Sequence, residues 1–293
     1  MTALPSSVPQ SRLSGLGSGI VAATTFALSD VFSKVALTAG MDPLSLATFR
    51  GAFSVVVMVG WLWLQPPPVP YTVRQRWIAL GIGVLFAGVV FGLFKAFELV
   101  TVPVAILTYF IYPLLTGIIG ALIGVDKLGW RGAAAALVAF FGLALIVGAQ
   151  PGAVALSGIA FALGAGCLRT AVLLISRAAL AGADSRLLSW YSQLSSTAIF
   201  VLVSLATWNW HAPQTGAGWF ALMVVSITVT IAVLTLFISI NRIGPFRSAL
   251  IMNLEPLIAM VGSALVLGDT ITPLQGLGAA TMLAALAAFQ LLK

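Results

Sequence analysis

Long apolar runs separated by short polar segments make up most of the chain. Each run has about 20 residues, the length a helix needs to cross the roughly 30 Å hydrocarbon core of a bilayer. The proline-rich segment 65–70 cannot continue a helix and predicts a loop. The pattern predicts ten membrane-spanning helices, at about 16–38, 44–64, 76–97, 102–123, 129–148, 155–177, 186–207, 216–240, 246–267 and 274–292.

One of these runs occurs twice. The segment 99–126 returns 143 residues later at 242–269, with Pro113 matching Pro256 and an aspartate ending both copies. A repeat of this length indicates two related halves. Since each half would hold an odd number of spans, the second half must insert upside down, with a pseudo-two-fold axis in the membrane plane. Transporters with this symmetry hold their substrate near the midplane, between the halves.

The repeat and the spans divide the chain into three parts. We expect a cytoplasmic tail at 1–14, a first five-helix repeat at 15–148 and an inverted second repeat at 155–293. Under this topology the inner loops and ends hold ten lysines and arginines, and the outer loops hold none. That bias predicts that both termini are cytoplasmic.

Composition supports a membrane protein and excludes several other classes. The chain is 60% hydrophobic and 7% charged, too few charges to cover a soluble protein of 293 residues. We therefore predict an all-α integral protein of the bacterial inner membrane. The net charge of +7 reflects the loop bias rather than nucleic-acid binding. With one cysteine and one histidine, no metal site, disulfide or cofactor is expected.

The sequence motifs do not support an enzymatic function. The chain has no phosphate-binding loop and no H-E-x-x-H metal motif, and its serines lack a nearby base. A receptor or scaffold would not account for inverted halves. A channel-like facilitator stays open.

The repeated segments resemble the drug/metabolite transporter superfamily, in its ten-helix EamA-type branch. The first half departs from the second by having Tyr112 where the second has Glu255, and both segments end in aspartate where the family more often has glutamate. The run Tyr109-Phe110-Ile111-Tyr112-Pro113 resembles the aromatic amino-acid exporters of the family. The residues that carry the wider resemblance are Ala105, Pro113, Leu114 and Asp126, then Ser248 to Leu250, Leu254 to Leu257, Leu267 to Asp269, Gly276, Gly278 and Phe49-Arg50.

The resemblance implies a secondary transporter that exports small amphipathic metabolites by alternating access. Amino acids are the favoured substrates, and aromatic or bulky apolar ones above others. Threonine-like amino acids and cationic drugs are alternatives. The expected partners are a small-molecule substrate, the lipid bilayer and a proton as coupling ion, and the oligomeric state is left open.

The intramembrane prolines are the first candidate residues. A proline inside a span removes a backbone donor and frees the carbonyl four residues earlier, that of Tyr109 for Pro113 and of Met252 for Pro256. Such carbonyls are tolerated in hydrocarbon where they line a cavity or meet a polar neighbour. The prolines therefore indicate either hinges that expose acceptors to substrate or static kinks.

Ionisable residues inside spans form the second set, because their burial is costly and usually functional. Asp30 and Lys34 lie one helical turn apart and, with Arg50, fall in the outer half of their spans. They could bind a carboxylate, although Lys34 can also extend to the interface. Arg169 and Glu255 lie deeper, where they could pair, or Glu255 could cycle a proton.

A cavity wall is the third prediction. Tyr109 and Tyr112 share a helix face beside the proline and could stack a flat substrate. An amphipathic zwitterion also needs polar groups for its amine and carboxylate. Further candidates for substrate contact are Phe86, Phe237, Thr235 and Asn253.

Overall fold

A computed structural model describes residues 12–100, 102–126, 129–147, 155–208, 210–268 and 271–291. All regular structure in these ranges is helical, as expected. Seven helical segments are long and apolar enough to cross a membrane, and three shorter apolar helices accompany them. Ten crossings remain a prediction. The tail up to residue 11, the link at 148–154 and Asp269 lie outside the described residues.

Three helices of the first half, α2, α3 and α5, begin at a polar cap or with a proline in the first turn. Asp42 accepts hydrogen bonds from the Leu44 and Ser45 amides at 2.9 and 3.1 Å and so starts α2. Thr72 and Gln75 form a reciprocal capping box at the start of α3. The elements are α1 (Arg12–Thr38), α2 (Pro43–Leu64), α3 (Val73–Leu99), α4 (Val102–Tyr109), α5 (Tyr112–Leu122) and α6 (Trp130–Val147).

The second half follows the same plan. Asp184 accepts from the Arg186 amide at 2.8 Å and starts α8, in the place that Asp42 has before α2. Thr215 caps α9 by accepting from the Gly218 amide at 3.1 Å. The elements are α7 (Leu156–Leu180), α8 (Ser185–Thr207), α9 (Gly216–Ile243), α10 (Pro245–Ile251), α11 (Leu254–Leu267) and α12 (Pro273–Leu291).

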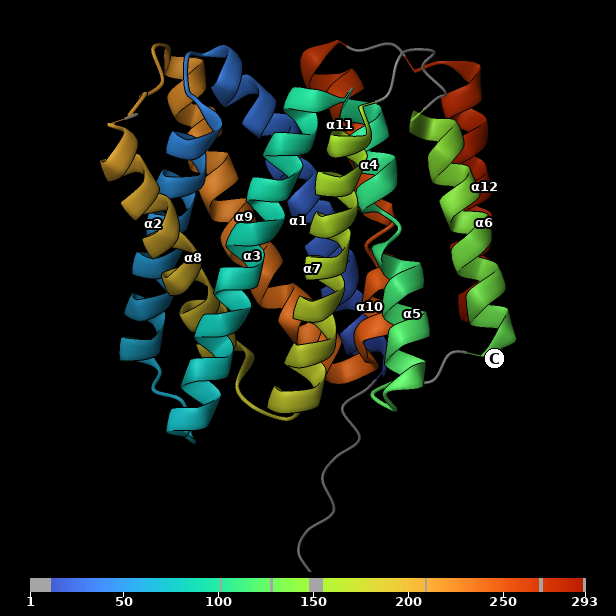
Figure 1. The fold of residues 1–293 in the computed structure, drawn as a ribbon, viewed down its shortest axis with the longest axis horizontal. Coiled ribbons are helices and arrows are strands. Elements are labelled where there is room, and N and C mark those ends of the chain that lie inside the picture. Colours follow the sequence, from blue (N-terminus) through green and yellow to red (C-terminus); the bar gives the residue numbers. More distant parts are fainter. Residues whose placement is uncertain are drawn as a thin grey trace, which may run out of the picture.

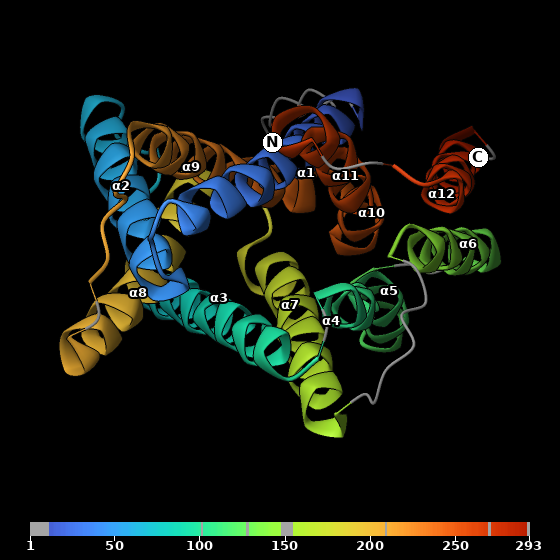
Figure 2. The same cartoon turned by 90° about the horizontal axis from the view of Figure 1, so that it is seen from above.

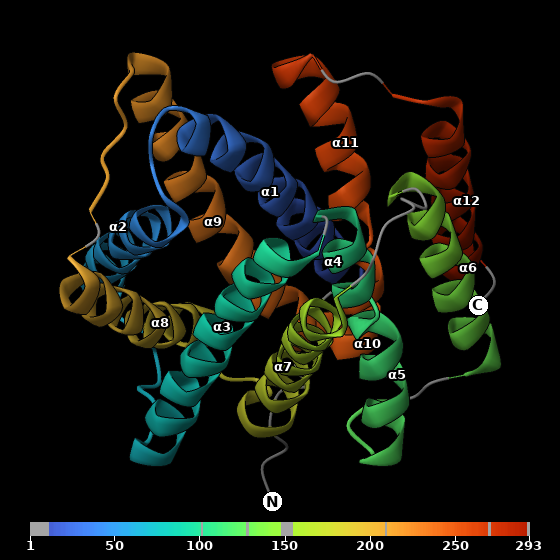
Figure 3. The same cartoon turned by 45° about the horizontal axis from the view of Figure 1, so that its top comes forward.

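The helices pack in pairs, and the repeat relates each pair either to another pair or to itself. α1 packs along α9, and its counterpart α7 packs along α3, while α2 packs on its own counterpart α8 and α6 on α12. In Figure 1 α3 runs upward and α9 downward, so equivalent helices point in opposite directions. Figures 2 and 3 show the α6–α12 pair at one side of the bundle. This exchange is what a two-fold relation between the halves requires.

The two ends of the bundle are packed differently. We call the end where α1 begins and α12 ends the terminal face (Figure 1). Near it α5 packs against α10, whereas the counterparts α11 and α4 make no comparable contact in the described chain. The Asp126 carboxylate after α5 also accepts from the Phe246 amide of α10 at 3.0 Å. Gly244 allows this approach, since its φ of +89° disfavours a side chain and a Cβ would lie 2.8 Å from an Asp126 oxygen. The bundle is thus joined across the halves near the terminal face.

Candidate functional site

The two predicted proline kinks are full interruptions. α4 ends at Tyr109 and α5 begins at Tyr112, with Pro113 in its first turn. α10 and α11 are separated in the same way, with Pro256 in the first turn of α11. Proline fits a first turn because its missing N–H would have no intrahelical partner there. Each half therefore carries a broken helix at the same place in its sequence.

The carbonyls at the breaks do not offer the acceptors that the sequence suggested. The Met252 carbonyl accepts a hydrogen bond from the Glu255 amide at 2.9 Å, so the expectation that Pro256 leaves it free is wrong. The chain makes a tight turn there that restores the bond. The Tyr109 carbonyl faces α7 at Gly166, where a Cβ would lie 2.9 Å from the oxygen. Because Gly166 has no side chain, α7 covers this carbonyl.

Arg169 of α7 lies in a cage of aromatic rings beside the first break. Its side chain is 4% exposed. Its guanidinium carbon lies 5.4 Å from the ring centre of Phe26, 5.2 Å from that of Phe86 and 5.8 Å from that of Tyr112. Aromatic faces attract a cation, most strongly where water is excluded. Apart from the Tyr112 hydroxyl, these rings carry no hydrogen-bond acceptor, so they do not satisfy all the donors of the guanidinium.

Two polar atoms in the cage have no hydrogen-bond partner among the described residues. These atoms are Arg169 Nε and the Tyr112 hydroxyl, and both are buried. The Tyr112 carbonyl is satisfied, since it accepts from the hydroxyls of Thr116 at 2.7 Å and Thr170 at 3.3 Å. A buried polar group without a partner costs about 1–3 kcal/mol. An incoming acceptor such as a carboxylate would relieve that cost.

An acidic pair lies beside the second break. The carboxyls of Asp30 on α1 and Glu255 on α11 are within interaction range of each other, and Arg50 of α2 acts on Asp30. Asp30 keeps accessible surface, and Arg50 and Glu255 are only half-buried, although protein atoms surround all three. A molecule the size of water can therefore touch each of these residues. Arg169 and Glu255 do not form the ion pair that was one of the two alternatives for them; they interact only at longer range.

The cage and the acidic pair occupy equivalent positions. Tyr112 and Glu255 correspond through the 143-residue repeat, and Asp30 and Arg169 correspond when Gly19 of α1 is aligned with Gly158 of α7. Each pair joins the restarted half of a broken helix to the first helix of the other half, α5 to α7 and α11 to α1. The same backbone arrangement thus carries a cation on one side of the two-fold axis and carboxyls on the other.

The remaining predicted residues belong neither to the cage nor to the acidic pair. Phe237 is fully buried and packs edge-on against Phe86, with ring centres 6.1 Å apart, so it belongs to the core. The Thr235 hydroxyl bonds the Ile231 carbonyl of its own helix at 2.7 Å. Asn253 is buried at the second break. Tyr109 packs on Tyr112 with ring centres 5.3 Å apart. Lys34 is exposed, one turn beyond Asp30 on α1.

Sequence reasoning missed Phe26 and the role of Asp126. Phe26 lies one turn before Asp30 on the same face of α1, a spacing that could have marked it as a neighbour of the charged residues. Asp126 was noticed only as the end of a repeated motif, and nothing in the sequence names its partner on α10. Among the described residues no group of three or more histidine, cysteine or acidic side chains could hold a metal ion.

The fold and these paired sites define a class: an all-helical membrane protein built from two repeats around an internal polar site. The EamA-like transporter family matches residues 13–148 and again 156–289, so the chain belongs to that family, one match per half. No curated protein matches the chain. A solved crystal structure aligns with a TM-score of 0.82 at 18% identity, covering 96% of this chain and 99% of its own. At that identity it shows the shared fold alone. The chain is thus a multi-pass membrane transporter of small molecules.

Proposed function

We propose that this protein is a secondary transporter that exports amino acids across the bacterial inner membrane, with aromatic or bulky apolar ones favoured. The observation that carries the proposal is the opposed charge at the two broken helices. A guanidinium lacking a hydrogen-bond partner at Nε lies in an aromatic cage on one side. Two acidic residues that keep accessible surface lie on the other. An amino acid carries the complementary charges, an ammonium and a carboxylate, on the same carbon atom.

Each end of the substrate has a matching group. The substrate carboxylate would accept from Arg169, which gains a charge-assisted hydrogen bond that its aromatic neighbours cannot supply. The ammonium would face Asp30 and Glu255. An aromatic side chain would contact Phe26, whose ring lies against Arg169 one turn from Asp30.

The packing at the two ends supports alternating access. The contact between α5 and α10 closes the bundle near the terminal face, and the equivalent contact between α4 and α11 is not made in the described chain. With both termini cytoplasmic, this state opens outward. Exchange of the two contacts by rocking of the halves at the broken helices would open the site inward, as two-fold related halves permit.

The deciding experiment measures uptake of labelled phenylalanine, tryptophan and threonine into proteoliposomes, with and without a pH gradient. Saturable uptake of the aromatic pair above threonine is expected. Equal transport of all three would remove the aromatic preference, and non-saturable flux would indicate a channel-like facilitator.

A cationic substrate is the second candidate, favoured by one observation. Asp30 is exposed, whereas Arg169 is almost fully buried, so a ligand could engage the carboxyls alone. Transport of phenethylamine, which is phenylalanine without its carboxylate, distinguishes the amino-acid proposal from the cationic-substrate proposal. Transport of phenethylamine as fast as phenylalanine would favour cation export and contradict the role of Arg169.

Proton coupling is proposed for the acidic pair. Two carboxyls within interaction range share protons readily, because both cannot ionise without repulsion. Glu255→Gln should abolish accumulation driven by a pH gradient and leave substrate counterflow intact. Lys34→Gln, one turn from Asp30 but outside the pair, is the matched control. If the Glu255 variant loses counterflow as well while staying folded, Glu255 binds substrate and does not couple protons.

A further inference from the structure

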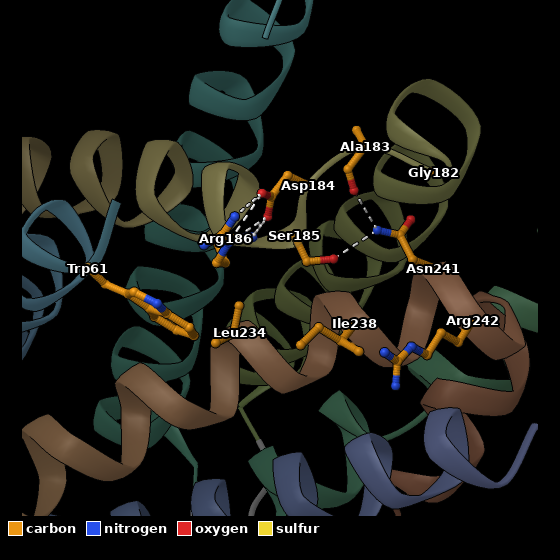
Figure 4. Close-up of a pocket in the computed structure, with 10 residues that line it drawn as sticks. All are labelled: Trp61, Gly182, Ala183, Asp184, Ser185, Arg186, Leu234, Ile238, Asn241 and Arg242. Atoms are coloured by element: carbon orange, nitrogen blue, oxygen red, sulfur yellow. Dashed lines mark hydrogen bonds and ion pairs between the residues drawn. The ribbon is translucent and has the colours of Figure 1, made fainter. Parts of the chain in front are cut away.

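A cavity with several polar and charged residues in its lining lies at the terminal face, away from the broken helices. It has a volume of about 330 Å³ and is formed by the end of α2, the α7–α8 link and the last turns of α9 (Figure 4). At about 30 Å³ per water, such a volume holds roughly ten waters, or a phosphate ester with a small alcohol. None of the residues of the transport site lines it.

One arginine in this cavity is already neutralised. Arg186 pairs with Asp184 at 2.7 Å between Nη2 and Oδ2 and donates to the Gln65 carbonyl at 3.1 Å. Burial alone would raise the pKa of Asp184, but the hydrogen bonds and charge of Arg186 outweigh it and hold that pKa below its ordinary value. The Asp184 carboxylate therefore stays charged at neutral pH. Arg186 stabilises the link and adds no net charge.

The second arginine leaves a positive charge uncompensated. Arg242, on the last turn of α9, is exposed and forms no ion pair or hydrogen bond with any other residue the structure describes. Beside it, Asn241 Nδ2 donates to the Ser185 hydroxyl oxygen at 2.9 Å (Figure 4). Because that oxygen accepts from Asn241, the Ser185 hydrogen is left for another acceptor, and Ser185 lines the cavity. A guanidinium and a hydroxyl donor together suit an anion, and a phosphate best.

The surroundings favour a lipid as the carrier of that anion. Trp61, at the end of α2, lines the cavity, and tryptophan collects at the level of lipid head groups. From Ile238 in the cavity wall an apolar stripe continues up α9 through Leu234, Ile231 and Ile227, whose spacing keeps them on one face. Ile231 and Ile227 are 39% and 43% exposed, while Leu234, which also lines the cavity, is 9% exposed. A free phosphate would need no such stripe, but an acyl chain would lie along it.

We propose that this cavity binds an anionic phospholipid of the inner leaflet, with its phosphate on Arg242 and Ser185 and an acyl chain along α9. Basic pockets between transmembrane helices on the cytoplasmic side are the usual places for such head groups. The site holds the end of α2, the α7–α8 link and α9 together, so an occupied site stabilises the fold. It is independent of the transported substrate.

The test measures the thermal unfolding midpoint of the purified full-length protein in detergent, titrated with phosphatidylglycerol or phosphatidylcholine. Phosphatidylglycerol should raise the midpoint, and phosphatidylcholine should raise it far less. Arg242→Gln should weaken the apparent affinity for phosphatidylglycerol about tenfold, since it removes a charged hydrogen-bond partner. Arg74→Gln, an exposed arginine of the first turn of α3 that lies outside the cavity, is the matched control and should retain the full shift.

Two outcomes would overturn the proposal. Equal shifts for the Arg242 and Arg74 variants would show that phosphatidylglycerol acts through general surface charge. A shift of the same size with millimolar inorganic phosphate would show that the ligand is a soluble anion and that the stripe on α9 is not used. Comparing the two lipids within each variant cancels any effect of the substitution on the fold itself.

Discussion

The two broken helices share a backbone and differ in chemistry. At the first, Tyr112 and two phenylalanines surround Arg169 and exclude water; at the second, Glu255 meets Asp30 in a region that keeps accessible surface. The repeat supplies two equivalent positions where a helix restarts at a proline. The residues at these positions differ between the halves: Tyr112 stands where the second half has Glu255, and Arg169 stands where the first half has Asp30. One position therefore carries a cation and the other carries carboxyls. A two-fold scaffold can in this way hold a substrate that is itself asymmetric.

The glycine at the first break marks a second difference. Gly166 lets α7 cover the Tyr109 carbonyl, while the equivalent residue of α1, three residues before Asp30, is Ala27, which is itself fully buried. At the second break the equivalent carbonyl, that of Met252, is satisfied by the Glu255 amide instead. The two breaks therefore treat these carbonyls differently: a turn gives the Met252 oxygen a hydrogen bond, and close packing of α7 covers the Tyr109 oxygen.

Among substitutions at the two breaks, Arg169→Leu is expected to have the largest effect on transport. Removing the cation leaves only the acidic side, so transport of phenylalanine should fall at least thirtyfold, in line with about 2–5 kcal/mol for the loss of a buried charged partner. Arg177→Leu, two turns further on α7 and bonded to the Asn241 carbonyl, is the matched control. Uptake is measured in proteoliposomes after size-exclusion chromatography confirms folding. Unchanged uptake with a folded Arg169 variant would show that the cage is structural.

Tyr112→Ala should produce the next largest effect. The ring is 1% exposed, and its loss opens a cavity that costs about 3–5 kcal/mol of folding free energy. It also removes one of the rings predicted to stack a flat substrate, so uptake of aromatic substrates should fall more than uptake of threonine. Tyr112→Phe keeps the ring and removes only a hydroxyl without a partner, so its stability and its aromatic preference should match the native protein. Equal losses for both substrate classes in Tyr112→Ala would contradict the stacking role.

The smallest effect is expected at the covered carbonyl. Gly166→Ala places a methyl 2.9 Å from the Tyr109 oxygen, so α7 must move away, at a cost of about 1–3 kcal/mol. Gly164→Ala is the control on the same helix, because a Cβ there meets nothing within 4 Å. Thermal unfolding should show a lower midpoint for the first variant alone. Matching midpoints would mean that the contact between α7 and the first break is loose.

Much of the architecture follows from local properties of the chain. Apolar length predicts the helices, and proline at 113 and 256 predicts where two of them are interrupted, because a missing N–H acts on the backbone wherever the residue lies. The repeat predicts two related halves, which the two family matches confirm. Intramembrane charge likewise marked Arg169, Glu255 and Asp30 as candidates, since burying them is costly in any fold.

The tertiary structure decided which side chains are in contact. Sequence suggested Arg169 with Glu255, but packing of α1 on α11 placed Asp30 beside Glu255, and packing of α7 on α5 placed Arg169 among aromatic rings. Phe26, Gly166 and the Asp126 bond to α10 became visible only with the helices assembled. A side chain's cost of burial belongs to its residue type, whereas its partners depend on helix faces brought together from distant parts of the chain.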